Sequence, residues 1–134
     1  MAQVLNDKPG VLVTRGFTQV LTQAYEAVVA PHAITTRWTY TVPSGRIAFL
    51  EAVHSLLEPT TAANQAGTFI LVTRSGGGAQ RFYTRLSGAT IYDIGNDPYD
   101  VSLAAGDVVT GQSSNGDAVA REIRLAAYFR EITL

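Results

Sequence analysis

Most of this chain consists of short runs in which apolar and polar residues alternate, and turn residues separate the runs. In the clearest run, Ile34, Trp38, Tyr40 and Val42 share one face of an extended strand, and threonines occupy much of the other. Comparable runs cover residues 46–57, 68–74, 80–86, 89–94, 99–103, 107–112 and 119–132. About eight short strands with turns between them predict an all-β fold, an antiparallel sandwich or barrel.

The first 33 residues follow a different pattern. Residues 1–16 contain Pro9-Gly10 and other turn residues, so we expect an extended arm there. Within residues 17–29 the apolar residues recur at three- and four-residue spacings, which predicts a short helix. Thr, Val and Tyr in the same segment leave a strand open as the alternative. We therefore divide the chain into an N-terminal arm over 1–33 and a sandwich domain over 34–134.

Charge is scarce in this sequence. Charged residues make up 16% of the 134, against roughly 25% in a typical globular protein, and the net charge is −1. A weakly charged surface loses little solvation when it is buried, so this composition is compatible with extensive subunit contacts. Nine of the ten basic residues are arginine, which interfaces favour, although genomic base composition produces the same bias. The charge balance provides no basic field for nucleic acid.

The sequence also bears on compartment. The N-terminal segment lacks the apolar run of a signal peptide, and no segment is apolar over the length that a bilayer requires. We therefore expect synthesis in the cytoplasm and no membrane partner. Cysteine is absent, which excludes disulfides and thiolate metal sites.

Glu51 and His54 raise the question of catalysis, because they interrupt an otherwise apolar strand. Positions three apart on a strand point to opposite faces, so we predict that the two residues form no catalytic dyad. The only histidines are His32 and His54, which cannot supply the His-x-His pair of metal-dependent cupins. We therefore predict no catalytic residues and no cofactor, and do not expect an enzyme.

The segment DIGNDPYD gathers four residues with oxygen ligands within eight positions: Asp93, Asn96, Asp97 and Asp100. Such residues can bind calcium, but this spacing is not that of an EF-hand. Asn, Asp, Gly and Pro are also the residues that turns use. We expect a loop at Gly95–Pro98 and retain these residues only as a weak calcium candidate.

Six residues are candidates for contact with a partner protein. SGGGA predicts a tight hairpin whose second strand places Arg81, Tyr83 and Arg85 on one face, with Arg74 across the turn. Arginine with an interleaved tyrosine suits a protein interface or nucleic acid, and the low net charge favours the protein. Leu50 and Leu56, with Ala52, are predicted to form a partly apolar outer face of strand 46–57 that another subunit or the chain itself covers.

Two turns and the final strand support a resemblance to a known group. TVPSGRIAFLEAV places a Pro-Ser-Gly corner between two strands, VSLAAGDVVTGQSSN places an Ala-Ala-Gly-Asp turn between two more, and REIRLAAYFREI closes the fold. Over residues 34–132 this arrangement resembles the single jelly-roll β-sandwich proteins of tailed-phage virions, and capsid decoration (cement) proteins most of all. The resemblance implies a homotrimer on the capsid surface of a virion that contacts the major capsid protein and reinforces the head shell, with an N-terminal arm that reaches a neighbour.

These observations define three hypotheses about function. The leading one is a virion structural protein that decorates and stabilises a phage head. The second is a tail or host-attachment module whose sandwich loops bind a glycan, with Trp38 and tyrosines available for stacking on sugars. The third, an enzyme for a small molecule or sugar on a β-sandwich, lacks a recognisable set of catalytic or metal-binding residues.

Overall fold

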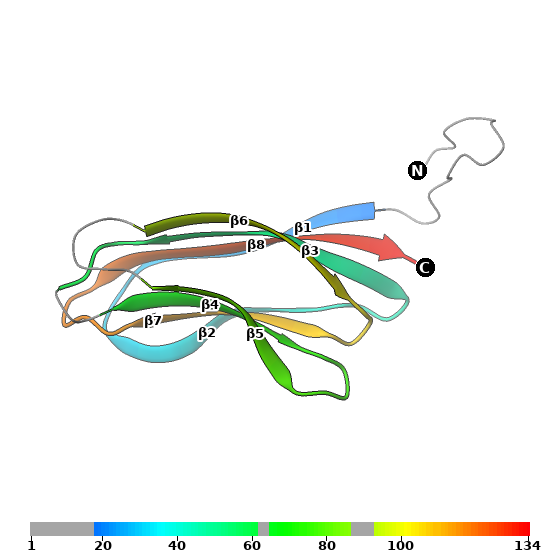
Figure 1. The fold of residues 1–134 in the computed structure, drawn as a ribbon, viewed down its shortest axis with the longest axis horizontal. Helices are drawn as coiled ribbons and strands as arrows, with labels where there is room; N and C mark the ends of the chain where they lie inside the picture. The colour runs from blue at the N-terminus through cyan, green and yellow to red at the C-terminus, as the bar shows by residue number, and fades with distance from the viewer. Residues whose placement is uncertain (1–17, 62–64, 87–92) are drawn as a thin grey trace.

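A computed structural model describes residues 18–61, 65–86 and 93–134. These residues form eight strands: β1 Thr18–Val29, β2 His32–Thr41, β3 Arg46–Leu57, β4 Ala66–Thr73, β5 Ala79–Leu86, β6 Asp93–Leu103, β7 Val108–Asn115 and β8 Arg121–Thr133. They pair into two four-stranded antiparallel sheets, ordered β1-β8-β3-β6 and β2-β7-β4-β5, which lie face to face (Figure 1). The predicted antiparallel sandwich of about eight strands is confirmed, and its strand order is that of a jelly roll.

The N-terminal part of the fold differs from the prediction, and the helix expected over 17–29 is wrong. Thr18–Val29 forms β1, an edge strand that pairs with β8 without interruption from Thr18↔Ile132 to Val29↔Arg121. Hydrogen bonding to β8 stabilises this Val- and Thr-rich segment as a strand more than an isolated helix would stabilise it. The expected boundary at residue 34 therefore falls inside the sandwich, and the arm expected over 1–16 lies outside the described residues.

The core lies between the two sheets and is centred on Phe129 of β8. The Tyr40 ring stacks on Phe129 with 4.3 Å between centroids, and Trp38 meets it edge-on at 6.3 Å. Ile123, Leu125 and Ala127 are buried along the same side of β8, which confirms the alternation predicted for this strand. Burial of a side chain as large as Phe129 contributes about 3 kcal/mol, so this aromatic cluster accounts for a substantial part of the stability.

Strand β2 departs from the predicted alternation near its start. Trp38, Tyr40 and Val42 are buried as expected, but Ile34 is 49% exposed. The pairing with β7 shifts register between His32 and Thr35 and again between Thr36 and Trp38. Each shift changes which residues face the core, so Ile34 no longer shares a face with Trp38.

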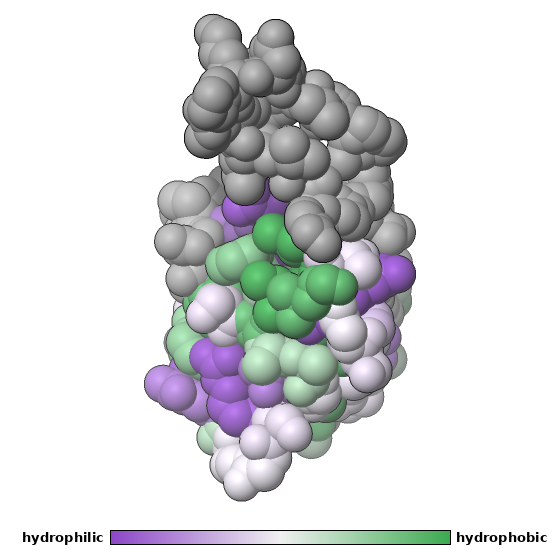
Figure 2. All heavy atoms as spheres, turned by 90° about the vertical axis from the view of Figure 1, so that its right-hand side faces the viewer, coloured by the Kyte–Doolittle hydropathy of each residue, from purple (hydrophilic) through white to green (hydrophobic). Residues whose placement is uncertain are grey.

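One end of the sandwich is closed by three tight turns. They connect β2 to β3, β4 to β5 and β6 to β7, and each contains a glycine with positive φ: Gly45 at 77°, Gly76 at 76° and Gly106 at 87°. Only glycine adopts this conformation at little cost, which explains why these positions are glycine. The Pro43-Ser44-Gly45 corner lies where the sequence predicted it. Seen from this end, where β8 also terminates, the molecule shows a patch of apolar side chains (Figure 2).

Strand β6 is longer than expected. Residues 93–103 form one strand that pairs with β3, so the loop predicted at Gly95–Pro98 is replaced by strand backbone. A register shift opposite Leu50 and Ala52 accommodates the irregular stretch around Pro98. The described residues contain no helix long and apolar enough to cross a membrane.

Candidate interaction surface

The candidate surface lies on the outward side of the sheet formed by β1, β8, β3 and β6, where β3 and β8 carry half-buried and exposed side chains. Strands β3 and β8 are the central strands of this sheet, and they pair in the register Ala52↔Tyr128 and His54↔Ala126. The residues that we call the β3–β8 outer face are Phe49, Glu51, Ala52, His54 and Leu56 from β3, and Glu122, Arg124, Ala126, Tyr128 and Arg130 from β8. This face is the candidate interaction surface.

A bulge in β3 changes the predicted geometry of Glu51 and His54. Leu50 and Val53 are both buried although they are three positions apart, because the register with β8 shifts between Leu50 and Ala52. Glu51 is the extra residue of this bulge, so Glu51 and His54 lie on the same outer side of the sheet. The predicted opposite placement of the two residues is therefore wrong. The Glu51 carboxylate pairs with Arg130, with 2.6 Å between Oε2 and Nη2.

The charges on the β3–β8 outer face largely neutralise each other. Arg130 pairs with Glu51, and its guanidinium carbon also lies 5.4 Å from the centre of the Phe49 ring. Arg124 pairs with Glu122 at 2.7 Å on the same face of β8. Such exposed pairs add at most about 1 kcal/mol each to stability. Their main effect appears when another subunit covers the face, because each arginine then keeps its carboxylate partner and its charge is not buried alone.

The arginine-rich hairpin does not form the predicted patch. Tyr83 is 4% exposed, and its hydroxyl lies 2.6 Å from Oγ of Ser55 inside the sandwich. Arg81 is exposed on the outer side, with its guanidinium carbon 4.6 Å from the centre of the Phe69 ring. The pairing of β4 with β5 skips Phe82, and this bulge places Arg81 and Tyr83 on opposite faces. The prediction that they share a face is therefore wrong.

The other predicted contact residues are also dispersed. Arg74 donates to Oδ2 of Asp107 at 2.9 Å and to the Ser102 carbonyl at 2.7 Å, so it joins two turns. Leu50 is fully buried in the core and cannot line an outer surface. Leu56 is half-buried on the β3–β8 outer face, as predicted. Arg85 pairs with Thr68 through the backbone, and its side chain lies outside the described part of the structure.

The calcium candidate also falls largely outside the described structure. Asp93, Asn96, Asp97 and Asp100 belong to the strand β6, and the structure does not describe their side chains. Among the residues that the structure describes, no group of three His, Cys, Asp or Glu side chains is placed to hold a metal ion.

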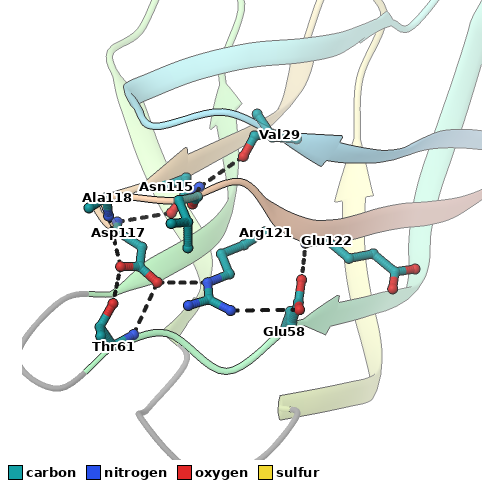
Figure 3. Close-up of polar contacts among 9 residues, drawn as sticks. Val29, Glu58, Thr61, Asn115, Asp117, Ala118, Arg121 and Glu122 are labelled. Atoms are coloured by element: carbon teal, nitrogen blue, oxygen red, sulfur yellow. Dashed lines mark hydrogen bonds and ion pairs between the residues drawn. The ribbon is translucent and has the colours of Figure 1, made fainter.

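Sequence reasoning missed a buried aspartate, Asp117, at the end of the sandwich opposite the three tight turns. Its carboxylate accepts hydrogen bonds from the Thr61 hydroxyl, the Thr61 N–H at 3.0 Å, the Ala118 N–H at 2.7 Å and the Arg121 Nε at 2.6 Å (Figure 3). The Asn115 side chain extends this network, because its amide donates to the carbonyls of Val29 and Val119. Asp117 therefore ties the segment after β3 to the loop before β8.

Asp107 has the corresponding role among the three tight turns. Its carboxylate accepts from the N–H groups of Ser75 and Ala104, each at 2.9 Å, and from Arg74. Its own carbonyl accepts from the N–H of Val42 at 3.0 Å. One side chain and its backbone thus connect all three turns.

Both aspartates are held in the charged form. Hydrogen bonds from the Thr61 hydroxyl and N–H, together with Arg121, lower the pKa of Asp117 far below its usual range. Burial opposes ionisation of Asp107, but the Ser75 and Ala104 amides and the Arg74 guanidinium outweigh burial and lower its pKa. The only sequence signal for either residue was an Asp in a turn segment, which carries no information about its distant donors.

Comparisons with known proteins found no relative from which the fold or the function of this chain can be argued. The chain matches no known protein family and no curated protein. A structure described under Bacillus endospore appendages that form disulfide-linked pili is 13% identical, with 95% of this chain and 99% of that chain covered and a TM-score of 0.42. A structure of the infectious bursal disease virus Gt strain is 12% identical, with a TM-score of 0.44, and the alignment covers 99% of this chain and 38% of that chain. At these values neither similarity carries an argument about function.

Proposed function

We propose that this chain is a structural protein of a virion, nearest in kind to a capsid decoration protein, whose copies associate with one another and with the major capsid protein. The β3–β8 outer face supports this proposal most directly. It combines aromatic and aliphatic side chains, Phe49, Leu56 and Tyr128, with arginines that already have carboxylate partners. Tyrosine and arginine are the residues that most often dominate the energy of protein interfaces.

The size of the sheet is adequate for this role. Four strands of 11 to 13 residues present an outer face on the order of 700 Å², from the usual strand rise and spacing. Stable interfaces cover roughly 800 Å² on each partner. One sheet face of this chain therefore approaches the area of a complete subunit contact.

The proposed mechanism is thermodynamic. A protein that binds only the assembled shell stabilises that shell by mass action. The networks around Asp107 and Asp117 fix the described turn segments that they bond at the two ends of the sandwich, so binding need not order those segments and loses less entropy. The trimeric state and the capsid-surface location implied by the resemblance are part of this proposal, as are the cytoplasmic synthesis expected from the N-terminal sequence and the absence of enzymatic activity.

A glycan-binding role receives less support from the geometry. Trp38 is 8% exposed, its indole packs on Gly111, and its Nε1 donates to the Leu125 carbonyl at 3.3 Å. Trp38, the residue proposed for stacking on sugars, is thus buried in the core and is not accessible to a glycan.

The proposal is tested by replacing Tyr128, which is 37% exposed on the outer face, with aspartate. Light scattering after size-exclusion chromatography measures the oligomeric state, and sedimentation with shells of the major capsid protein of the same virion measures binding. We expect wild-type protein to self-associate and to sediment with the shells, and Tyr128→Asp to lose at least one of these properties. The matched control is Thr39→Asp, which changes an exposed position on β2 in the other sheet. Wild-type protein that remains monomeric at high concentration and does not bind shells would contradict the proposal.

A further inference from the structure

The sandwich has four edge strands, and they are not equally protected against pairing with another strand. Strands β1 and β6 border one sheet, and β2 and β5 border the other. An edge strand exposes backbone N–H and C=O groups that can pair with any further strand. Proteins commonly prevent this with bulges, prolines or short strands.

Three of these edges carry such protection. Strand β2 contains two register shifts, at His32/Thr35 and at Thr36/Trp38. Strand β5 has only eight residues and is bulged at Phe82. Strand β6 contains Pro98 and pairs irregularly with β3 around it. Each interruption bends or breaks the row of groups that a partner strand would need.

Strand β1 lacks every one of these devices. It runs for 12 residues, Thr18–Val29, without proline, lysine or arginine. Its register with β8 is unbroken over all 12 pairs. Within the part of the chain that the structure describes, β8 is its only strand partner. This regular edge is the one in the sandwich best suited to accept another strand.

We propose that the edge of β1 binds β1 of a second copy in antiparallel orientation, so that the two β1-β8-β3-β6 sheets form one eight-stranded sheet across a two-fold axis. The composition of β1 suits pairing with itself, since Glu26 is its only residue that is charged at neutral pH. If the axis passes through the pair formed by Gln23 of the two copies, Glu26 lies opposite Val20 of the other copy, so the two Glu26 residues are not opposed.

The inference deepens the proposed function, because it names a surface through which copies associate. It adds a two-fold contact that the proposed function does not require. In an assembly built from trimers, this contact would join one trimer to the next. Self-association through another surface would leave the proposed function intact and remove only this inference.

The absence of cysteine from the chain permits a direct test. Single variants Thr22→Cys, Gln23→Cys and Ala24→Cys are oxidised with oxidised glutathione, alone and in pairwise mixtures. Directly opposed residues of an antiparallel pair have Cα atoms about 4.5–5.5 Å apart, within the range that a disulfide spans. Thr39→Cys, at an exposed position of the bulged edge strand β2, is the matched control. Circular dichroism verifies that each variant retains the fold.

We expect rapid disulfide-linked dimers from one β1 variant or one mixture of two, and none from the control. Equal crosslinking of Thr39→Cys would indicate random collision and would overturn the inference. If light scattering shows wild-type oligomers but no β1 variant forms a crosslink, the inference is overturned and the proposed function is not. If the wild type is a monomer that binds no shells, both the inference and the proposed function are overturned. Crosslinks that form only after deletion of residues 1–16 would show that the chain's own N-terminal segment covers this edge, which also overturns the inference.

Discussion

Tyr40 of one sheet and Glu131 of the other are joined through the interior by a hydrogen bond of 2.5 Å from the phenol hydroxyl to Oε2. The second carboxylate oxygen of Glu131 accepts from Arg46 at 2.5 Å. Glu131 is 2% exposed, so its charge is stabilised inside the protein by these two donors. Burial and the neighbouring carboxylate raise the pKa of the Tyr40 phenol well above its ordinary value.

The raised pKa of Tyr40 predicts a loss of stability in alkali. Above about pH 10 the unfolded chain releases the phenol proton while the folded protein retains it, so the free energy of unfolding falls as pH rises. Below that pH this contribution is fully present. Above about pH 10, we expect the free energy of unfolding of the wild type to fall more steeply with pH than that of Tyr40→Phe, by about 1.4 kcal/mol per pH unit. Urea titrations from pH 8 to 11 measure both slopes, and Tyr128→Phe, which retains Tyr40, should follow the wild type.

The network around Asp107 predicts a matching sensitivity to acid. Because the folded pKa is lowered, the stabilisation is present above the unfolded value of about 3.9 and is lost as pH falls through the folded value. Asp107→Asn should destabilise the protein by about 2 kcal/mol at pH 7, since it weakens the hydrogen bonds of a buried carboxylate. The difference from wild type should shrink below pH 4 in urea titrations. A difference that stays constant with pH would contradict this account.

Asp117 predicts a local effect at the opposite end of the sandwich. Its carboxylate accepts from the N–H groups of Thr61 and Ala118. In Asp117→Asn the acceptor loses its charge, so these two amides should exchange with solvent faster, as measured by NMR hydrogen exchange. The Ser75 amide, which donates to Asp107, serves as an internal control and should keep its wild-type rate. Uniform acceleration at both ends would indicate global rather than local destabilisation.

Gly111 is expected to tolerate no side chain. A Cβ at this position would lie 2.2 Å from Cε2 of the Trp38 indole, which is buried in the core. Gly111→Ala should therefore displace the indole and destabilise the protein by about 3 kcal/mol, measured by chemical denaturation. Gly78→Ala is the control, because a Cβ there meets no atom of the described residues within 4 Å.

Thr68 offers a stabilising substitution. Its hydroxyl is fully buried, and Oγ1 has no hydrogen-bond partner among the described residues. Thr68→Val keeps the shape of the side chain and removes the unsatisfied group, so we expect a gain of about 1 kcal/mol in the free energy of unfolding. A loss of stability would indicate that the hydroxyl has a partner that the described residues do not include.

The sequence predicted the parts of the fold that depend on local pattern. The alternation of Ile123, Leu125, Ala127 and Phe129 on β8 is visible in the residues themselves, because each second position is apolar. The segment 17–29 has a helical period but also residues that favour strands, and only the distant partner β8 decides between helix and strand.

The candidate surface was harder to predict because it depends on bulges. The extra residues Glu51 and Phe82 each reverse the side on which the following side chains lie. Because of the bulges, Leu50 no longer shares a face with Ala52 and Leu56, Tyr83 no longer shares one with Arg81, and Glu51 lies on the same side as His54. A bulge exists only relative to the residues of the strand opposite, so it is difficult to predict from the sequence of one strand.

The pairing of β1 with β8 has a consequence for how the chain folds during synthesis. The six strands between them are translated before β8, so β1 cannot gain its only described partner until nearly the whole sandwich has left the ribosome. Non-local pairing of this kind slows folding and leaves a regular, unpaired strand exposed in the nascent chain. The completion of β8 therefore sets the earliest moment at which β1 is paired on one side, and until then β1 is open to association with other nascent chains.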